Sequence, residues 1–310
     1  MRAYLFPGQG SQAVGMGAAL AEASAEARAV FAEVDEALGQ NLFALMRAGP
    51  EETLTLTENA QPAIMANSIA VLRVLEGMGT RLAEEADFVA GHSLGEYSAL
   101  CAAGALGLAA TARLLKLRGR AMQAAVPVGE GAMAALLGAD LERARALAQA
   151  AAQGQVCAIA NDNDPSQVVI SGDRAAIERA VALAREMGIK RALLLPVSAP
   201  FHCPLMAPAA RAMEVALGEV EIGEPAVALY ANVTAAPVSD PGIIARLLVE
   251  QVTGMVRWRE SVLAMAADGV DHFVELGGKV LGGMVKRIVP EARVTSLISI
   301  DDVDALAREL

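Results

Sequence analysis

The stretch VAGHSLGEYSALCAAGAL, residues 89–106, constrains the fold of this chain more than any other feature. It contains the pattern Gly-X-Ser-X-Gly at Gly91, Ser93 and Gly95. Such a serine occupies a sharp turn from a strand into a helix, where only glycine tolerates the close backbone approach and the unusual dihedral angles on either side. The preceding DFVA predicts a short buried strand, and the following alanine- and leucine-rich run predicts a helix. We therefore favour a serine nucleophile over a chance pentapeptide with two turn glycines.

The composition is that of a compact globular chain. With 310 residues, of which 55% are hydrophobic, it can form one large core or two unequal domains. The mean hydropathy of +0.41 reflects mainly alanine. The uncharged, alanine-rich run at residues 97–112 is shorter than the roughly 18 apolar residues of a membrane span. Because MRAYLFPGQG also shows no signal-peptide pattern, we expect a cytoplasmic protein without a membrane-spanning segment.

Charge and cysteine content argue against several partners and sites. The formal net charge is −11, whereas a phosphate backbone requires a clustered positive face, so we expect no nucleic-acid partner. Cys101, Cys157 and Cys203 are odd in number and far apart in sequence, which suggests neither a disulfide framework nor a metal site. A local basic patch remains compatible with an acidic protein partner.

Strand-like and helix-like segments alternate along most of the chain. This alternation predicts an α/β fold with a mainly parallel sheet flanked by helices. The expected strands are residues 3–6, 87–90, 227–231, 272–276 and 294–298, and the long expected helices are residues 17–38, 61–77, 108–125 and 258–267.

The pattern changes between residues 128 and 196. The segments GAMAALLG, DLERARALAQAAAQ, QVCAIAN, QVVISG, DRAAIERAVALAREMG and KRALLLPV follow the order β-α-β-β-α-β, which is the ferredoxin-like plan. We therefore predict a small ferredoxin-like α+β domain at residues 128–196, inserted into a larger domain made of residues 1–127 and 197–310. A cleft between the two domains would be the natural binding site.

A serine hydroxyl needs a base to take its proton, and the chain contains only three histidines. His92 adjoins Ser93 on the elbow, where successive side chains diverge, and His272 lies in an apolar strand pattern that indicates a structural role. His202 lies in PVSAPFHCPLM, a proline-rich loop, and loops on rigid scaffolds often carry catalytic groups. We therefore predict that His202 is the base. Because no acid between Ser93 and His202 stands out, we favour a dyad, with a carbonyl or amide orienting the imidazole, over a Ser–Asp–His triad.

The loop GQGSQA, residues 8–13, has two candidate uses. It matches the relaxed dinucleotide-binding pattern after a strand, but a proline precedes it, further glycines delay the helix, and no second strand ending in an acid follows at the expected distance. We favour the other use, in which the backbone N–H of Gln9 lies near the serine. Together with the N–H of Leu94, it could form an oxyanion hole.

Several basic residues lie in RLLKLRGRAM, residues 113–122, and most of them fit a solvated helix face. An acyl substrate with a free carboxylate would need a planar, bidentate partner, which arginine supplies and lysine does not. We single out Arg118 for this role.

Taken together, these segments resemble the malonyl-CoA:acyl carrier protein transacylases of bacterial fatty-acid synthesis. The resemblance spans nearly the whole chain through FPGQGSQ, GHSLGEYSAL, RGRAMQ, VSAPFHC, LVEQVTGMVRW and GGKVLGGMVKR. It implies a hydrolase-like α/β domain with a ferredoxin-like insertion, and malonyl transfer from malonyl-CoA to the phosphopantetheine thiol of acyl carrier protein through a malonyl-serine ester. It implies no cofactor, because malonyl-CoA is a substrate and the phosphopantetheine belongs to the carrier. We also expect a monomer.

The resemblance assigns roles by position. The nucleophile of the family falls on Ser93 and its base on His202. Its malonate-binding arginine falls on Arg118, and its histidine-orienting glutamine falls on Gln251. Its two oxyanion-hole amides fall on Gln9 and Leu94. Four further basic residues are candidates for binding coenzyme A phosphates or the carrier: Lys190, Arg191, Lys286 and Arg287. Each of them could equally be a solvated charge.

Two positions depart from the family pattern. Phe201 stands before the base where relatives of the fatty-acid type often have serine, which is similar to malonyl-selective domains of polyketide synthases. A bulky ring there would crowd an α-methyl group, so we predict rejection of methylmalonyl-CoA. Gly277 and Gly278 stand where the family commonly has Gly-Pro-Gly-Lys, which predicts a looser turn without an effect on the chemistry.

Three alternatives remain at this point. A serine esterase or thioesterase would share the elbow and the histidine, but would release free acid and would not need the arginine. A non-catalytic docking subunit is disfavoured because both Ser93 and His202 are retained. A malonyl-loading subunit of another pathway, such as malonate decarboxylation or polyketide synthesis, would carry the same residues.

Overall fold

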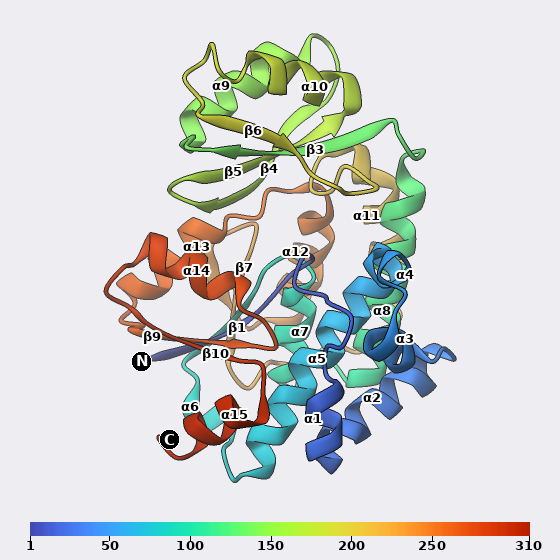
Figure 1. Cartoon of the computed structure of the whole chain (residues 1–310), viewed down its shortest axis with the longest axis vertical. Helices are drawn as coiled ribbons and strands as arrows, with labels where there is room; N and C mark the ends of the chain where they lie inside the picture. Colours follow the sequence, from blue (N-terminus) through green and yellow to red (C-terminus); the bar gives the residue numbers. More distant parts are fainter.

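The structure, a computed structural model that describes residues 1–310, contains two β-sheets that lie one above the other (Figure 1). The larger sheet has the strand order β10-β9-β1-β2-β7-β8. All its pairs are parallel except β7 with β8. Its strands are β1 (Arg2–Phe6), β2 (Phe88–Gly91), β7 (Ala228–Ala231), β8 (Ala236–Val238), β9 (His272–Leu276) and β10 (Arg293–Leu297).

Helices cover both faces of this sheet because its strands are apolar on both sides. In β1, Tyr4 and Phe6 belong to a core shared with α5 (Thr57–Gly77) and α7 (Gly95–Ala102). Ala3 and Leu5 point to the other face, into a core shared with α13 (Trp258–Ala267) and α14 (Val280–Ile288). The alternation follows from the two-residue period of a strand.

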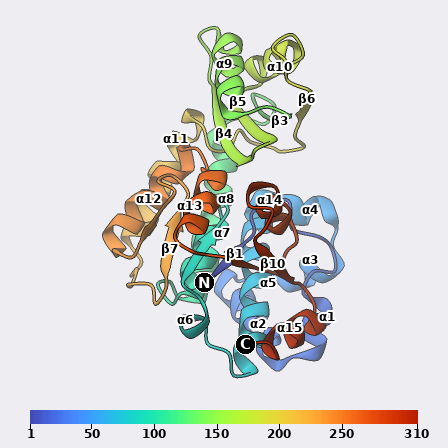
Figure 2. The same ribbon diagram turned by 90° about the vertical axis from the view of Figure 1, so that its left-hand side faces the viewer.

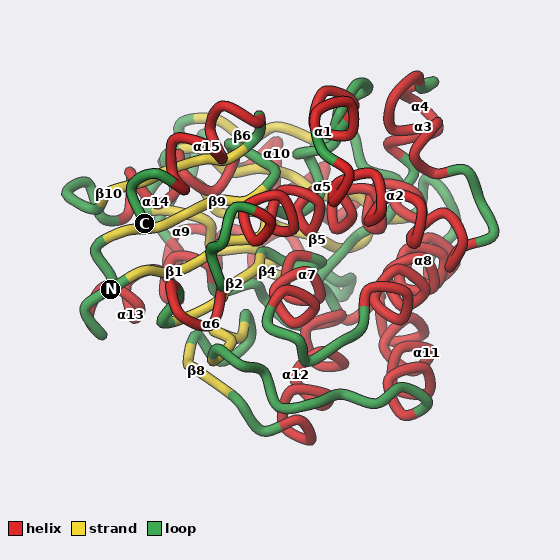
Figure 3. The backbone as a smooth tube through the Cα atoms, turned by 90° about the horizontal axis from the view of Figure 1, so that it is seen from below, coloured by secondary structure: helices red, strands yellow, loops and turns green.

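The remaining helices complete the large unit. These helices are α1 (Ala18–Ala23), α2 (Ala25–Leu38), α3 (Leu42–Ala48), α4 (Glu51–Thr55), α6 (Leu82–Glu85), α8 (Leu108–Ala125), the 3-10 helix η1 (Pro204–Met206), α11 (Ala207–Gly218), α12 (Pro241–Thr253) and α15 (Ile300–Ala307). Figure 3 shows α2, α8 and α11 gathered to one side of the strands of the large sheet. No helix has both the length and the apolar character that a membrane crossing requires.

The smaller sheet is antiparallel throughout and has the order β4-β5-β3-β6. Its elements are β3 (Gly131–Leu137), α9 (Leu141–Ala152), β4 (Cys157–Asp164), β5 (Gln167–Asp173), α10 (Arg174–Leu183) and β6 (Arg191–Leu194). The two helices pack on the outer face of this sheet, away from the large unit (Figures 1 and 2). Its inner face, which includes Met133, Ala135 and Val169, borders a cavity above the large sheet.

Most expected elements are present, with ends that differ by a few residues. The expected helix over residues 17–38 is wrong as a single helix, because the chain breaks at Ser24. That residue is extended, with φ −129°, and its side chain accepts a hydrogen bond from the Ala27 N–H to begin α2. The expected strand over 190–197 is shorter, and the prolines at 196 and 200 fall outside it.

Candidate active site

Ser93 lies between the end of β2 and the start of α7, at a turn whose shape depends on the two flanking glycines. Ser93 itself has φ 56°, whereas Gly91 and Gly95 do not have positive φ, so the expectation of unusual dihedral angles at the glycines is wrong. The expected close approach is present: a Cβ on Gly91 would lie 1.8 Å from the backbone carbon of Gly95, and a Cβ on Gly95 would lie 2.1 Å from the Phe6 carbonyl oxygen. The glycines are therefore required because the backbone packs closely around the turn, whereas the strained backbone conformation is that of Ser93.

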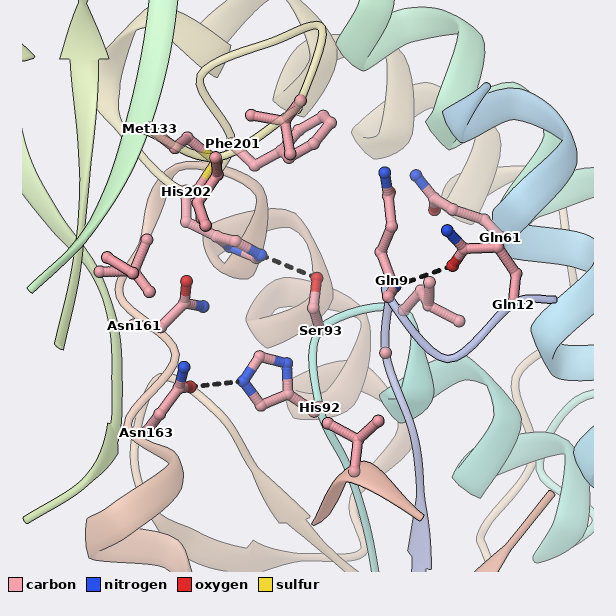
Figure 4. Close-up of a pocket in the computed structure, with 18 of the residues that line it drawn as sticks. Gln9, Gln12, Gln61, His92, Ser93, Met133, Asn161, Asn163, Phe201 and His202 are labelled. Carbon is pink, nitrogen blue, oxygen red and sulfur yellow. Dashed lines mark hydrogen bonds between the residues drawn. The ribbon is translucent and has the colours of Figure 1, made fainter. Parts of the chain in front are cut away.

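The Ser93 hydroxyl lies beside His202 (Figure 4), with 2.7 Å between Oγ and Nε2. The other ring nitrogen, Nδ1, lies 2.9 Å from the backbone carbonyl oxygen of Gln251. A carbonyl oxygen can only accept, so Nδ1 carries the proton and Nε2 is free to accept the serine proton. The pair thus forms a dyad oriented by a carbonyl, and the carbonyl belongs to the glutamine to which the family resemblance gave the orienting role.

His202 is buried in the wall of the site, with 3% of its surface exposed. Burial, and then the positive charge of Arg118, lower the pKa of its imidazole from 6.5 to about 3. Its ring is therefore neutral at physiological pH and able to act as a base. His202 also has φ 57°, so both members of the dyad adopt a strained backbone conformation.

Arg118 projects from α8 and is 1% exposed. Its guanidinium donates to Gln61 Oε1 and Gln251 Oε1, each at 2.8 Å, and its Nη2 lies 3.2 Å from Ser93 Oγ. All these partners are neutral, and the buried Nε has no partner at all. Because a buried charge without a counter-ion is costly, this arrangement favours an anionic group at the position next to Ser93.

The two predicted oxyanion donors line the same cavity as the serine. Leu94 immediately precedes α7, where the helix N-terminus leaves amides unpaired. Gln9 lies in the loop after β1, and its side-chain oxygen accepts a hydrogen bond from Thr57 Oγ1 at 2.9 Å. Neither backbone N–H donates to another protein atom. Both are therefore available to a ligand, although their role in catalysis stays a prediction.

The cavity around these residues has a volume of about 370 Å³ and lies between the carboxyl ends of the parallel strands and the inner face of the small sheet. The small sheet contributes the amide side chains of Asn161, Asn163 and Gln167. His92 faces them: its Nε2 lies 2.8 Å from Asn163 Oδ1, as Figure 4 shows. His92 therefore points away from the serine hydroxyl, as the divergence of side chains on the elbow predicts.

The other predicted residues lie outside the cavity lining. His272 is buried in β9, and its Nε2 lies 2.9 Å from Thr295 Oγ1, in agreement with a structural role. Lys190, Arg191 and Lys286 are exposed, and Arg287 pairs with Asp164 at 2.9 Å. Their proposed contacts with coenzyme A or a carrier stay predictions. All three cysteines are free, and the structure brings together no group of three His, Cys, Asp or Glu side chains that could hold a metal ion.

Sequence reasoning missed a polar network beneath the elbow. The Asn232 side chain accepts a hydrogen bond from the Ser93 N–H at 2.8 Å and donates to the Gly91 carbonyl at 2.7 Å. The Asn232 N–H in turn donates to Glu96 Oε1 at 2.7 Å, and Glu96 also accepts from the Gln251 side chain. The one sequence signal was an acid, Glu96, at the start of an otherwise uncharged helix.

Three comparisons relate the chain to known proteins. Residues 3–279 match the acyl transferase domain family. The malonyl CoA-acyl carrier protein transacylase of Escherichia coli K12 is 45% identical over 296 residues, which cover 95% of each chain.

Two solved structures are also closely similar. The acyl-carrier-protein-S-malonyltransferase of Bartonella henselae is 51% identical, with a TM-score of 0.97 over 99% of this chain and 98% of its own. A malonyl-transacylase solved in complex with a type II polyketide synthase acyl carrier protein is 41% identical, with a TM-score of 0.96 over 100% and 99% of the two chains.

Proposed function

The chain belongs to the acyl transferase family, among its malonyl CoA-acyl carrier protein transacylases, and on that premise we propose that it transfers a malonyl group from coenzyme A to the phosphopantetheine thiol of an acyl carrier protein. The observation that carries the proposal is the position of Ser93 Oγ, which lies 2.7 Å from the base His202 and 3.2 Å from an arginine without a counter-ion. A nucleophile in that position can attack an acyl group whose far end is a carboxylate.

The first half-reaction forms a malonyl ester on Ser93. Oγ attacks the thioester carbonyl carbon while Nε2 of His202 accepts the hydroxyl proton. The N–H groups of Gln9 and Leu94 stabilise the oxyanion. The C–S bond then breaks, and the proton on His202 passes to the departing sulfur of coenzyme A.

The second half-reaction reverses these steps with a different thiol. The phosphopantetheine thiol of the carrier gives its proton to His202, and its sulfur attacks the ester carbonyl. The C–O bond to Ser93 breaks, and the proton returns from His202 to Oγ. The enzyme ends as it began, so the cycle needs no cofactor.

Arg118 selects the acyl group and also tunes the base. A malonyl carboxylate would receive charge-assisted hydrogen bonds from the guanidinium, including the Nε that has no partner in the protein. The same carboxylate would neutralise the charge that contributes to the low pKa of His202. The pKa of the base would then rise toward its usual range when the correct substrate is bound, which strengthens the base for proton transfer.

We also propose finer labels for the fold. The element order β3-α9-β4-β5-α10-β6 and the strand order of the small sheet support a ferredoxin-like domain at residues 128–196. The serine elbow at the carboxyl end of a parallel strand supports a hydrolase-like domain formed by residues 1–127 and 197–310. A monomer that acts in the cytoplasm without nucleic acid stays a prediction, as does the choice between fatty-acid synthesis and another malonyl-loading pathway.

Intact-mass spectrometry tests the proposed function. The wild type and Ser93→Ala are exposed briefly to malonyl-CoA and then to phosphopantetheinylated carrier protein. We expect one malonyl group on the wild type only, and its transfer to the carrier. An adduct that goes to free malonate and ignores the carrier would instead indicate a hydrolase, and the absence of any adduct would refute the acyl-serine mechanism.

A further inference from the structure

Glu96 is a buried acid that the proposed mechanism does not use. It is the second residue of α7, follows Ser93 by one turn, and is 1% exposed. It forms no ion pair: one carboxyl oxygen accepts from the Asn232 N–H and the other from the Gln251 side-chain amide. Burial raises the pKa of this carboxyl to about 8, and the hydrogen bonds from Asn232 and Gln251 and the charge of Arg118 oppose that rise.

The contact with Glu96 is one of two that set which way the amide of Gln251 faces. Its Nε2 donates both to Glu96 and to the Ser93 carbonyl oxygen, the latter at 2.9 Å. Its Oε1 is therefore the atom that faces Arg118, at 2.8 Å from Nη2. A reversed amide would place an NH₂ group against the guanidinium, where both groups are donors and neither can accept.

We propose that Glu96 is a positioning residue for acyl-group selection: it fixes the amide orientation of Gln251, which in turn holds the Arg118 guanidinium where a carboxylate on the acyl group can reach it. This inference rests on the proposed function. The shortest hydrogen-bonded link between Glu96 and Arg118 runs through the Gln251 side chain, whereas His202 is oriented by the Gln251 backbone carbonyl. Loss of the Glu96 contact should therefore affect selection of the acyl group more than the reactivity of the serine.

The substitution Glu96→Gln isolates this effect. The side chain keeps its size, but one accepting oxygen becomes an NH₂ donor. If the remaining oxygen accepts from the Asn232 N–H, the new NH₂ faces Gln251 and favours the reversed amide. Arg118 then loses an accepting partner. Because a hydrogen bond to a charged group is worth about a factor of ten or more, we expect the ratio of kcat/KM for malonyl-CoA to that for acetyl-CoA to fall about tenfold or more, mainly through KM for malonyl-CoA.

Two readouts separate positioning from a general structural role. Labelling of Ser93 by a fluorophosphonate reports the reactivity of the serine without a carboxylate on the probe, and we expect its rate to change less than about threefold in Glu96→Gln. Glu275→Gln is a matched control, because Glu275 is also fully buried but accepts from the N–H groups that begin α14, at 2.7–3.0 Å. That variant should lower thermal stability without changing the malonyl-to-acetyl ratio.

A double-mutant cycle with Gln251→Met tests whether Glu96 acts through the glutamine. Methionine removes the amide, so we expect Glu96→Gln to have no further effect on the ratio in that background. An unchanged ratio in Glu96→Gln, or an equal effect of the substitution with and without the Gln251 amide, would overturn the inference. Should Glu96→Gln fail to fold, Glu96→Asp withdraws the carboxyl by one methylene and should lower the same ratio. A wild type that transfers no malonyl group would instead refute the proposed function.

Discussion

Replacement of Arg118 by methionine offers the most direct test of how the site recognises its acyl group. Methionine keeps an unbranched apolar stem in a position that is 1% exposed, but removes the charge and all five N–H donors. The variant therefore lacks any group that could bind a carboxylate next to Ser93, while the Ser93–His202 pair stays in place.

The loss for malonyl-CoA can be worked out from the contacts. A bidentate carboxylate would gain two charge-assisted hydrogen bonds, each worth about 1.5–3 kcal/mol. Their combined loss, roughly 3–6 kcal/mol, corresponds to a decrease in kcat/KM of about 10²–10⁴-fold. We expect the lower end of this range, because two of the guanidinium nitrogens already donate to Gln61 and Gln251 in the free protein.

Acetyl-CoA should respond differently, because it has no carboxylate to lose. The charge of Arg118 is one cause of the low pKa of His202, so its removal raises that pKa and strengthens the base. The substitution also removes the Nη2 contact to Ser93 Oγ, which leaves the oxygen more nucleophilic. We expect kcat/KM for acetyl-CoA to stay the same or to rise.

The assay compares both thioesters in the wild type, Arg118→Met and Arg118→Lys. Lysine keeps the positive charge but not the planar fork, so it should recover part of the malonyl rate. Because Arg118→Met leaves two buried carbonyl oxygens without a donor, thermal unfolding must show that the variant is folded at the assay temperature. Equal losses for malonyl and acetyl groups in a folded variant would refute the carboxylate-binding role.

Three further predictions follow from the site. Gly91→Ala and Gly95→Ala should each prevent folding, because the new Cβ would lie 1.8 Å and 2.1 Å from backbone atoms; soluble protein with wild-type melting behaviour would contradict this. Fluorophosphonate labelling of Ser93 should stay nearly constant from pH 8 down to about pH 5, because a base with its pKa lowered to about 3 is already neutral throughout; a midpoint near 6.5 would show an unperturbed histidine. Phe201→Ser should increase transfer from methylmalonyl-CoA relative to malonyl-CoA, because Phe201 lines the cavity beside the base; an unchanged ratio would exclude a steric role for the ring.

The sequence predicted those secondary-structure elements whose residues carry a clear local pattern. The strand, the serine and the helix around residue 93 follow from glycine spacing and apolar runs, and the six elements of the small unit follow from alternating periods. The break at Ser24 was missed because alanine-rich sequence on both sides suits a helix, while the serine also suits an N-cap. In that case the two local signals compete, and the structure has the cap.

The supporting residues of the site could not be predicted in the same way, because their partners are distant in sequence. Glu96 and Asn232 are 136 residues apart, and Gln251 is 155 residues from Glu96. For a glutamine in a helix or an asparagine after a strand, the neighbouring sequence does not indicate that the side chain is buried or which groups it hydrogen-bonds. Gln251 was identified only through the family resemblance, which carries information about the tertiary contacts of the relatives.

The separation of the buried acid from the buried arginine has a chemical reason. A direct ion pair between Glu96 and Arg118 would satisfy both charges, but a substrate carboxylate would then have to displace a partner that is already ideal. Gln251 lies between the two and offers an acceptor to the arginine and a donor to the acid. Because the amide is neutral, it orients the guanidinium without cancelling its charge. The arginine therefore stays both fixed in position and free of a counter-ion, and these are the two properties that binding of an anionic acyl group requires.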